Sequence, residues 1–118
     1  MEDALERAFA FVDSGADAVM IHSRKKDPAE IFEFVDCFRE KDKQTPIVVV
    51  PTSFNTVTEE EFKERGVNIV IYANQLTRTG FPAMQNAAKM ILENHRAKEC
   101  DEICMPFKEI IRLIPEEN

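Results

Sequence analysis

The stretch that decides the fold is Gly15-Ala16-Asp17-Ala18-Val19-Met20-Ile21. A short apolar run without polar alternation predicts a strand covered on both faces, as in a parallel sheet. The glycine before it can end a helix by adopting a positive φ. A second run, Gly66-Val67-Asn68-Ile69-Val70-Ile71-Tyr72, echoes the first. The chain therefore repeats a helix–glycine–strand unit.

Helical and strand patterns alternate around these two runs. Two amphipathic helices are predicted from apolar residues at helical spacing, namely Leu5, Ala8, Phe9 and Val12, then Ile31, Phe34, Val35 and Phe38. The β-branched run Ile47–Val50 predicts a strand between the echoing pair, and the third strand is expected over residues 67–73. A longer helix is expected over residues 81–96, with Met84, Ala87, Ala88, Ile91 and Leu92 facing inward, and a last amphipathic segment contains Phe107, Ile110, Ile111 and Ile114.

Two helix starts carry explicit signals. Asp27-Pro28-Ala29-Glu30 supplies an N-cap, a first-turn proline and a glutamate in the capping-box position. Thr58 and Glu61 form the same box before a short helix that ends at Gly66. Each connection is long enough for parallel pairing of successive strands. We therefore expect an α/β fold made of about three βα units.

Composition limits the function classes. The chain has 118 residues and a net charge of −7, from 15 Lys and Arg against 22 Asp and Glu. This acidic balance disfavours nucleic acid and anionic membranes as partners, because binding them requires clustered cations. No run approaches the roughly 18 apolar residues of a membrane span. The N-terminus lacks the pattern of a secretory signal, and Cys37, Cys100 and Cys104 form no disulfide framework, so a cytoplasmic location is expected.

Polar residues follow each predicted strand, at the edge where parallel sheets place their sites. They are His22-Ser23-Arg24, Pro51-Thr52-Ser53 and Asn74-Gln75. These groups suit a small anion rich in oxygen atoms. The same residue types also serve structural roles: a histidine in a hydrogen bond, a threonine or asparagine in a loop. Glycine-rich phosphate loops are absent from the sequence, and no metal-ligand set is evident.

Several phrases in this order resemble phosphoenolpyruvate mutase, a family of the isocitrate lyase superfamily. They are Gly15-Ala16-Asp17-Ala18-Val19-Met20-Ile21-His22-Ser23 with Asp27-Pro28, Val48-Val49-Val50-Pro51-Thr52, Ile69-Val70-Ile71-Tyr72-Ala73-Asn74, and Lys108-Glu109-Ile110-Ile111-Arg112-Leu113. The resemblance implies that residues 1–118 form a single segment. This segment is the C-terminal part, strands six to eight, of a (β/α)₈ TIM-type barrel with C-terminal helices. A complete barrel needs about 250 residues.

The resemblance also implies a function. It is the isomerase reaction that interconverts phosphoenolpyruvate and phosphonopyruvate and forms the carbon–phosphorus bond of phosphonate biosynthesis. His22 is the catalytic residue expected by this resemblance, as a hydrogen-bond donor to substrate oxygens, and Ser23 is expected beside it in substrate binding. The family uses Mg²⁺, whose carboxylate ligands belong to earlier strands, so no metal ligand is assigned in this chain. We expect the chain alone to be inactive.

The resemblance further implies a homo-oligomer, with residues 98–118 as a docking helix or a helix swapped between subunits. Three alternatives stay open beside the mutase. Phosphonopyruvate hydrolase and a carbon–carbon lyase share the superfamily's barrel and metal. A non-catalytic half-barrel would instead act as an interaction protein.

Overall fold

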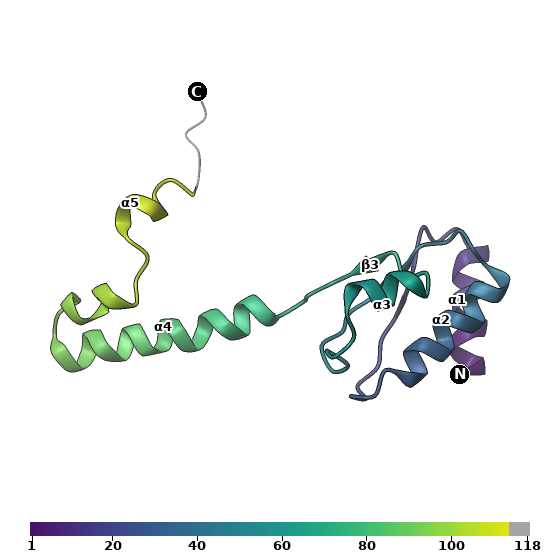
Figure 1. Ribbon diagram of the computed structural model, residues 1–118, viewed down its shortest axis with the longest axis horizontal. Coiled ribbons are helices and arrows are strands. Elements are labelled where there is room, and N and C mark those ends of the chain that lie inside the picture. The colour runs from purple at the N-terminus through teal and green to yellow at the C-terminus, as the bar shows by residue number, and fades with distance from the viewer. Residues whose placement is uncertain (114–118) are drawn as a thin grey trace, which may run out of the picture. The chain divides into compact units, whose positions relative to one another are not determined.

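The computed structural model describes residues 1–113, and it contains two compact units (Figure 1). The first unit runs from Met1 to Asn74, and the second begins at Gln75. The first holds helices and strands in alternation, and the second is helical.

The first unit contains a three-stranded parallel sheet in the order β1-β2-β3. Its strands are β1 (Val19–Ile21), β2 (Ile47–Val49) and β3 (Ile69–Val70). Met20 pairs with Val48, and Val48 pairs with Ile69, so these three residues form one row across the sheet. The predicted parallel α/β arrangement is confirmed. The first and third strands are shorter than the apolar runs predicted.

Three helices accompany the sheet: α1 (Glu2–Asp13), α2 (Ala29–Lys41) and α3 (Glu59–Glu64). The predicted apolar stripe of α2 is confirmed, since Ile31, Phe34, Val35 and Phe38 are all buried. The α1 stripe packs on the same core, and the Phe9 ring stacks on Phe38 with centroids 5.0 Å apart. Burying these side chains stabilises the fold by roughly 1.5–3 kcal/mol each.

The two faces of the edge strands differ, which corrects for β1 and β3 the prediction of strands covered on both faces, while β2 is buried throughout. Val19, Ile47 and Val49 face the helices and are buried. On the opposite face Met20 is 58% exposed, Ile69 46% and Ile71 39%. The alternation arises because successive side chains of a strand point to opposite sides. Val48 of the middle strand lies in the same row as Met20 and Ile69 but is only 8% exposed, so within residues 1–113 the opposite face is uncovered at the edge strands and not at β2.

The helix starts follow the sequence signals in one case and depart from them in the other. Thr58 and Glu61 form the full capping box at α3, as predicted. At α2, Pro28 rather than Asp27 is the N-cap residue. Asp27 still contributes, because its carboxylate accepts a hydrogen bond from the Ala29 amide at 2.9 Å. Glu30 turns away from the helix start, toward Ser23 and Lys25.

Arg39 joins the end of α2 to the segments that lead into two strands. Its guanidinium donates to the carbonyl oxygens of Asp42 and Thr45 at 3.0 and 2.9 Å. It also donates to the Gly66 carbonyl at 2.8 Å and to Asn68 Oδ1 at 2.8 Å. Gly66 has a φ of +88° and a Cβ there would lie 3.0 Å from Arg39 Nε, so both backbone and space favour glycine.

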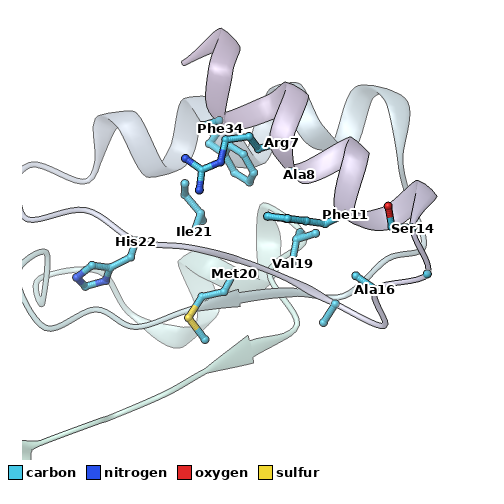
Figure 2. A pocket seen from close by; sticks show the side chains of 13 residues that line it. Arg7, Ala8, Phe11, Ser14, Ala16, Val19, Met20, Ile21, His22 and Phe34 are labelled. Carbon is cyan, nitrogen blue, oxygen red and sulfur yellow. The ribbon is translucent and has the colours of Figure 1, made fainter.

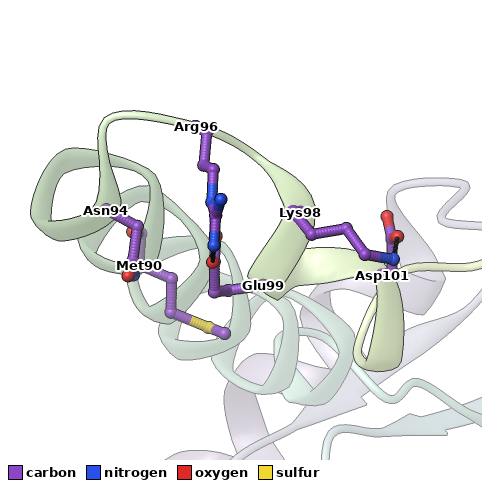
Figure 3. A network of polar contacts seen from close by, with 6 residues as sticks. All are labelled: Met90, Asn94, Arg96, Lys98, Glu99 and Asp101. Carbon is purple, nitrogen blue, oxygen red and sulfur yellow. Dashed lines mark hydrogen bonds and ion pairs between the residues drawn. The ribbon is translucent and has the colours of Figure 1, made fainter.

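The second unit contains α4 (Gln75–Asn94), the 3₁₀ helix η1 (Lys98–Glu102) and α5 (Phe107–Ile110). The long helix begins at Gln75 rather than at residue 81. It continues through Gly80 and Pro82, so local propensity underestimated its length. Short ion pairs order the turn after α4, with Arg96 bound to Glu99 at 2.5 Å and Lys98 to Asp101 at 2.6 Å (Figure 3).

The apolar side chains of this unit are not buried within the described residues, which contradicts the inward-facing stripe predicted for α4. Met84 is 64% exposed, and Leu92 is 74% exposed. The α4 contact is with η1, where the buried Cys100 thiol donates to the Ala87 carbonyl at 3.6 Å. The predicted segment around Phe107 forms the short α5, and its last apolar residue, Ile114, lies outside the described residues.

Replacing Arg39 by methionine tests its bridging role. Arg39→Met keeps an apolar stem but removes every guanidinium hydrogen bond. We expect a loss of about 2 kcal/mol in the free energy of unfolding, measured by urea denaturation, because hydrogen bonds from charged donors contribute roughly 1.5–3 kcal/mol. Arg7→Met is the control, since its ion pair with Asp3 is exposed. Equal effects of the two changes would contradict the assignment.

Asp42 gives the fold a pH dependence. Hydrogen bonds from the Thr45 side chain and from the Thr45 and Gln44 amides lower the pKa of Asp42 from 3.8. A lowered folded-state pKa contributes stability above the unfolded pKa, and that contribution disappears as pH falls through the folded value. The stability difference between wild type and Asp42→Asn should therefore shrink below pH 3.8. Urea denaturation at neutral and acidic pH measures this, with the exposed Asp17→Asn as control.

Candidate functional site

The carboxyl ends of the three parallel strands lie at one edge of the sheet, where sites of parallel folds form. His22 and Ser23 follow β1 directly. After β2 the chain turns sharply, with the Thr52 amide donating to the Val50 carbonyl at 2.8 Å. After β3 come Tyr72 and the half-buried Asn74. The predicted polar rim is therefore present at this edge.

The His22 side chain is exposed and lies on the uncovered side of the sheet. Figure 2 shows His22 and Met20 on one side of β1, while Ile21 lies on the opposite side, toward Phe34. The imidazole packs against Phe54, with ring centroids 6.3 Å apart and planes 52° from parallel. An aromatic contact on one side leaves ring nitrogens accessible to a ligand. His22 thus has the accessibility that a substrate contact requires.

Ser23 behaves differently from its neighbour, because it is 5% exposed and its hydroxyl is engaged within the chain. The Ser23 hydroxyl donates to Glu30 Oε1 and accepts a hydrogen bond from the Lys25 amide at 3.0 Å. Lys25 Nζ forms an ion pair with Glu30 Oε2. Lys25 and Ser23 lower the pKa of the Glu30 carboxyl, and Glu30 raises the pKa of Lys25. Ser23 therefore orders the turn that follows His22.

Phe54 links the candidate site to the core. Its side chain is fully buried and meets Phe62 of α3 edge to face, with centroids 6.3 Å apart. Edge-to-face aromatic pairs contribute roughly 0.5–1.5 kcal/mol beyond the area they bury. The ring on which His22 rests therefore belongs to the buried core.

The end of β3 is tied to the start of α3. The Tyr72 hydroxyl donates to Glu59 Oε1 at 2.8 Å, and this bond raises the pKa of Tyr72. Glu59 is at the first turn of α3, where a carboxylate also interacts favourably with the helix dipole. Tyr72 is 57% exposed, so this contact orients a side chain at the rim without burying it.

Two residues of the site are not identifiable from local sequence. The position of Glu30 predicts helix capping, and Phe54 lies in a stretch that the sequence predicts only as a loop. The contact between Ser23 and Glu30 spans a turn that no local motif describes. The contact between Phe54 and His22 joins the loops after two different strands, so only the tertiary structure brings them together.

Metal binding finds no support within residues 1–113. They contain no group of three or more His, Cys, Asp or Glu side chains that could hold an ion. The three cysteines differ in exposure: Cys37 is half-buried, Cys100 is buried and Cys104 is exposed. Burial raises the pKa of the Cys100 thiol. Across the same residues, no helix is long and apolar enough to cross a membrane.

A cavity of about 810 Å³ opens along α1 and β1 (Figure 2). Apolar side chains from both elements line it, including Ala8, Phe11 and Val19. His22 is at one end of the lining, while most of it follows the outer side of β1, which is an edge strand. The cavity therefore marks an uncovered sheet edge more than an enclosed ligand site.

A comparison with models of protein families shows which family the chain belongs to. The family model of phosphoenolpyruvate phosphomutase matches residues 1–92. The chain belongs to this family. Its apolar strands, His22 and the α2 and α3 starts all lie within the matched region.

The similarity to individual relatives covers the whole chain. The phosphoenolpyruvate phosphomutase of Tetrahymena pyriformis is 37% identical over 118 residues, which are 100% of this chain and 38% of that protein. The phosphonopyruvate hydrolase of Variovorax sp. is 36% identical, over 99% of this chain and 40% of the hydrolase. The chain thus spans about two fifths of the length of these relatives.

Solved structures agree with the sequence comparison. A phosphoenolpyruvate phosphomutase from Streptomyces platensis superposes with a TM-score of 0.85 at 31% identity, covering 95% of this chain and 38% of that one. A phosphonopyruvate hydrolase in complex with oxalate and Mg²⁺ gives a TM-score of 0.83 at 35% identity, covering 95% and 39%. The α/β architecture of this chain is therefore that of its relatives.

Truncating Phe54 tests its support of the site. Phe54→Ala should lower the free energy of unfolding by about 3 kcal/mol, because it empties a fully buried position. Phe11→Ala is the control, since that side chain is 56% exposed. Urea denaturation of both variants measures the difference. A loss at Phe54 no larger than that at Phe11 would show that Phe54 does not anchor the core.

Proposed function

We propose that this chain forms the last three βα units, strands six to eight, of a (β/α)₈ barrel that interconverts phosphoenolpyruvate and phosphonopyruvate. The family membership of residues 1–92 supports the proposal. So does the share of the relatives that it spans, which leaves room for the preceding units. The chain by itself is expected to have no turnover.

The observation that carries the proposal is the position of His22 on the uncovered apolar face of the sheet. In a closed barrel, one face of every strand packs on the outer helices and the other fills the interior. Here Met20, Ile69 and Ile71 occupy the face away from the helices, and His22 follows at the carboxyl end. Both β1 and β3 are edge strands that further strands could pair with. Barrel sites form at this end.

His22 would act by donating a hydrogen bond to the anionic oxygens of the substrate. Phosphoryl transfer passes through a transition state with charge spread over oxygen atoms, so fixed donors stabilise it. The packing of His22 on the buried Phe54 supports this role, because a donor held in place needs no reorganisation. Ser23 would contribute to substrate binding through its position beside His22, while its own hydroxyl is held by Glu30.

Magnesium is part of the proposal only for the complete protein. The related phosphonopyruvate hydrolase structure is a complex with Mg²⁺ and oxalate, a small dicarboxylate. The side chains in residues 1–113 do not fit such an ion, since they offer no cluster of candidate ligands. No step of this chain's chemistry is therefore assigned to the metal, whose ligands would come from the preceding strands.

We also propose that the protein assembles as a homo-oligomer in which residues 98–118 dock on or exchange with a neighbouring subunit. Large apolar side chains in the described part of this segment support it, because their exposure disfavours an isolated unit. They are Ile103, Met105, Phe107, Ile110, Ile111 and Leu113. The cytoplasmic location stays a prediction from the sequence.

Phosphonopyruvate hydrolase is the second candidate, since a hydrolase is as similar to this chain as the phosphomutases are. That reaction adds water across the carbon–phosphorus bond and releases pyruvate and phosphate. Phosphonopyruvate takes part in both reactions, so its binding alone does not separate them.

A chimera tests the proposal. The part of the Tetrahymena phosphomutase that precedes the matched region is joined to residues 1–118, and phosphonopyruvate conversion is followed by ³¹P NMR. We expect phosphoenolpyruvate to form, and His22→Ala to lower kcat/KM by about 100-fold, since a positioned donor contributes this much. His95→Asn is the control, because His95 lies in the second unit with a φ of 52° that asparagine tolerates.

The products decide between the candidates. Pyruvate and phosphate would identify the hydrolase reaction instead of the mutase reaction. No turnover in the chimera, while the intact Tetrahymena enzyme is active in the same assay, would contradict both. Turnover by residues 1–118 without the added part would contradict the expectation that the chain alone is inactive.

A further inference from the structure

Glu30 departs from the role its sequence position indicates. A glutamate three residues after an N-cap normally returns to the backbone amide of that cap. In α2, however, the N-cap residue is Pro28, which has no backbone N–H, so no capping box can form, and Asp27 accepts a hydrogen bond from the Ala29 amide at 2.9 Å. The Glu30 carboxylate turns back toward the preceding loop. Its two contacts are therefore with the segment before the helix, to Ser23 and to Lys25.

The carboxylate of Glu30 closes a small ring of contacts around the turn after β1. One oxygen accepts the Ser23 hydroxyl, and the other pairs with Lys25 Nζ. The Ser23 oxygen in turn accepts the Lys25 amide at 3.0 Å. Every polar group of this ring is thus held by another member. The ring fixes the backbone on the C-terminal side of His22.

His22 is therefore held from three directions. Its N-terminal neighbour, Ile21, belongs to β1 and pairs with Val49. Its C-terminal neighbour, Ser23, is buried and bound to Glu30. Its ring packs on Phe54. Of these three supports, the bond between Ser23 and Glu30 is the one made by polar side chains alone.

We propose that Glu30 is a positioning residue that fixes the His22 side chain through Ser23. The inference rests on the proposed function of His22. Positioning by an outer residue is chemically useful here, because a misplacement of about 1 Å can lower a rate by about 100-fold.

The charge of Glu30 is compatible with an anionic substrate nearby. A lone carboxylate close to the site would repel phosphate and carboxylate oxygens. Lys25 neutralises it, since the ammonium group is in direct contact with the second carboxylate oxygen. The ion pair is partly solvent-exposed, since the Lys25 side chain is 70% exposed and the Glu30 side chain 34%. The pair thus contributes little stability by itself, and its hydrogen bond to Ser23 carries the positioning.

The first test uses residues 1–118 and NMR. Glu30→Ala removes both contacts, while Glu30→Gln keeps an oxygen that can accept the Ser23 hydroxyl. We expect Glu30→Ala to weaken the nuclear Overhauser contacts between the His22 and Phe54 rings and to speed exchange of the Lys25 amide. Glu30→Gln should leave the intensity of the ring contacts and the exchange rate of the Lys25 amide within about threefold of wild type, because the lost ion pair is exposed. Glu60→Ala, which removes the exposed pair with Lys63, is the control.

The second test uses the chimera with the phosphomutase part. Glu30→Ala should lower kcat by about 10- to 100-fold with a smaller change in KM, and Glu30→Gln should restore most of it. The double variant with Ser23→Ala and Glu30→Ala should have the same kcat as Glu30→Ala alone, since both changes remove the same hydrogen bond.

The outcomes separate this inference from the proposed function. An inactive wild-type chimera contradicts the proposed function, and the NMR contacts then still judge whether Glu30 fixes His22. Unchanged ring contacts and Lys25 amide exchange in Glu30→Ala would overturn the inference even if the chimera is active. Equal losses in Glu30→Gln and Glu30→Ala would also overturn it, because the acceptor for Ser23 would then be irrelevant.

Discussion

The guanidinium of Arg39 is the interaction on which the first unit depends. It leaves the last turns of α2 and binds the carbonyls of Asp42 and Thr45, which precede β2, and that of Gly66, which precedes β3. Asn68 completes the link, because its side-chain oxygen accepts from both Arg39 and the Ile47 amide. One cation thereby sets where two neighbouring strands begin, and the strand ends that carry the candidate site follow from that registration.

Strand registration explains why the site and the uncovered face occur together. Because the strands are parallel and in sequence order, their carboxyl ends meet at one edge. Side chains alternate between the two faces, so the residues that face the helices form the core and those between them form an apolar surface. His22 lies on the same side of the sheet as this apolar surface. Its ring therefore extends beyond the apolar surface, where an enclosed barrel would place its reacting groups.

Much of the fold could be predicted from local patterns. The stripes of α1 and α2, the positive φ of Gly15 and Gly66, and the capping box of Thr58 are each encoded within a few residues. The start of α4 and the burial of its stripe could not be, because helix length and burial depend on what packs against the helix. In the candidate site, His22 was identifiable by resemblance, whereas Phe54 was not, since their contact joins loops distant in sequence.

The sequence by itself determined the alternation of helices and strands and the family, and it predicts His22 as the residue that contacts a substrate. These follow from short-range periodicity and from phrases that stand in a fixed order. Only the tertiary structure decided that Glu30 serves the turn after β1 instead of its own helix, and that one face of the sheet is left uncovered. The physical reason is the same for both: hydrogen-bond partners and burial depend on which segments the fold brings together, and this is not a local property.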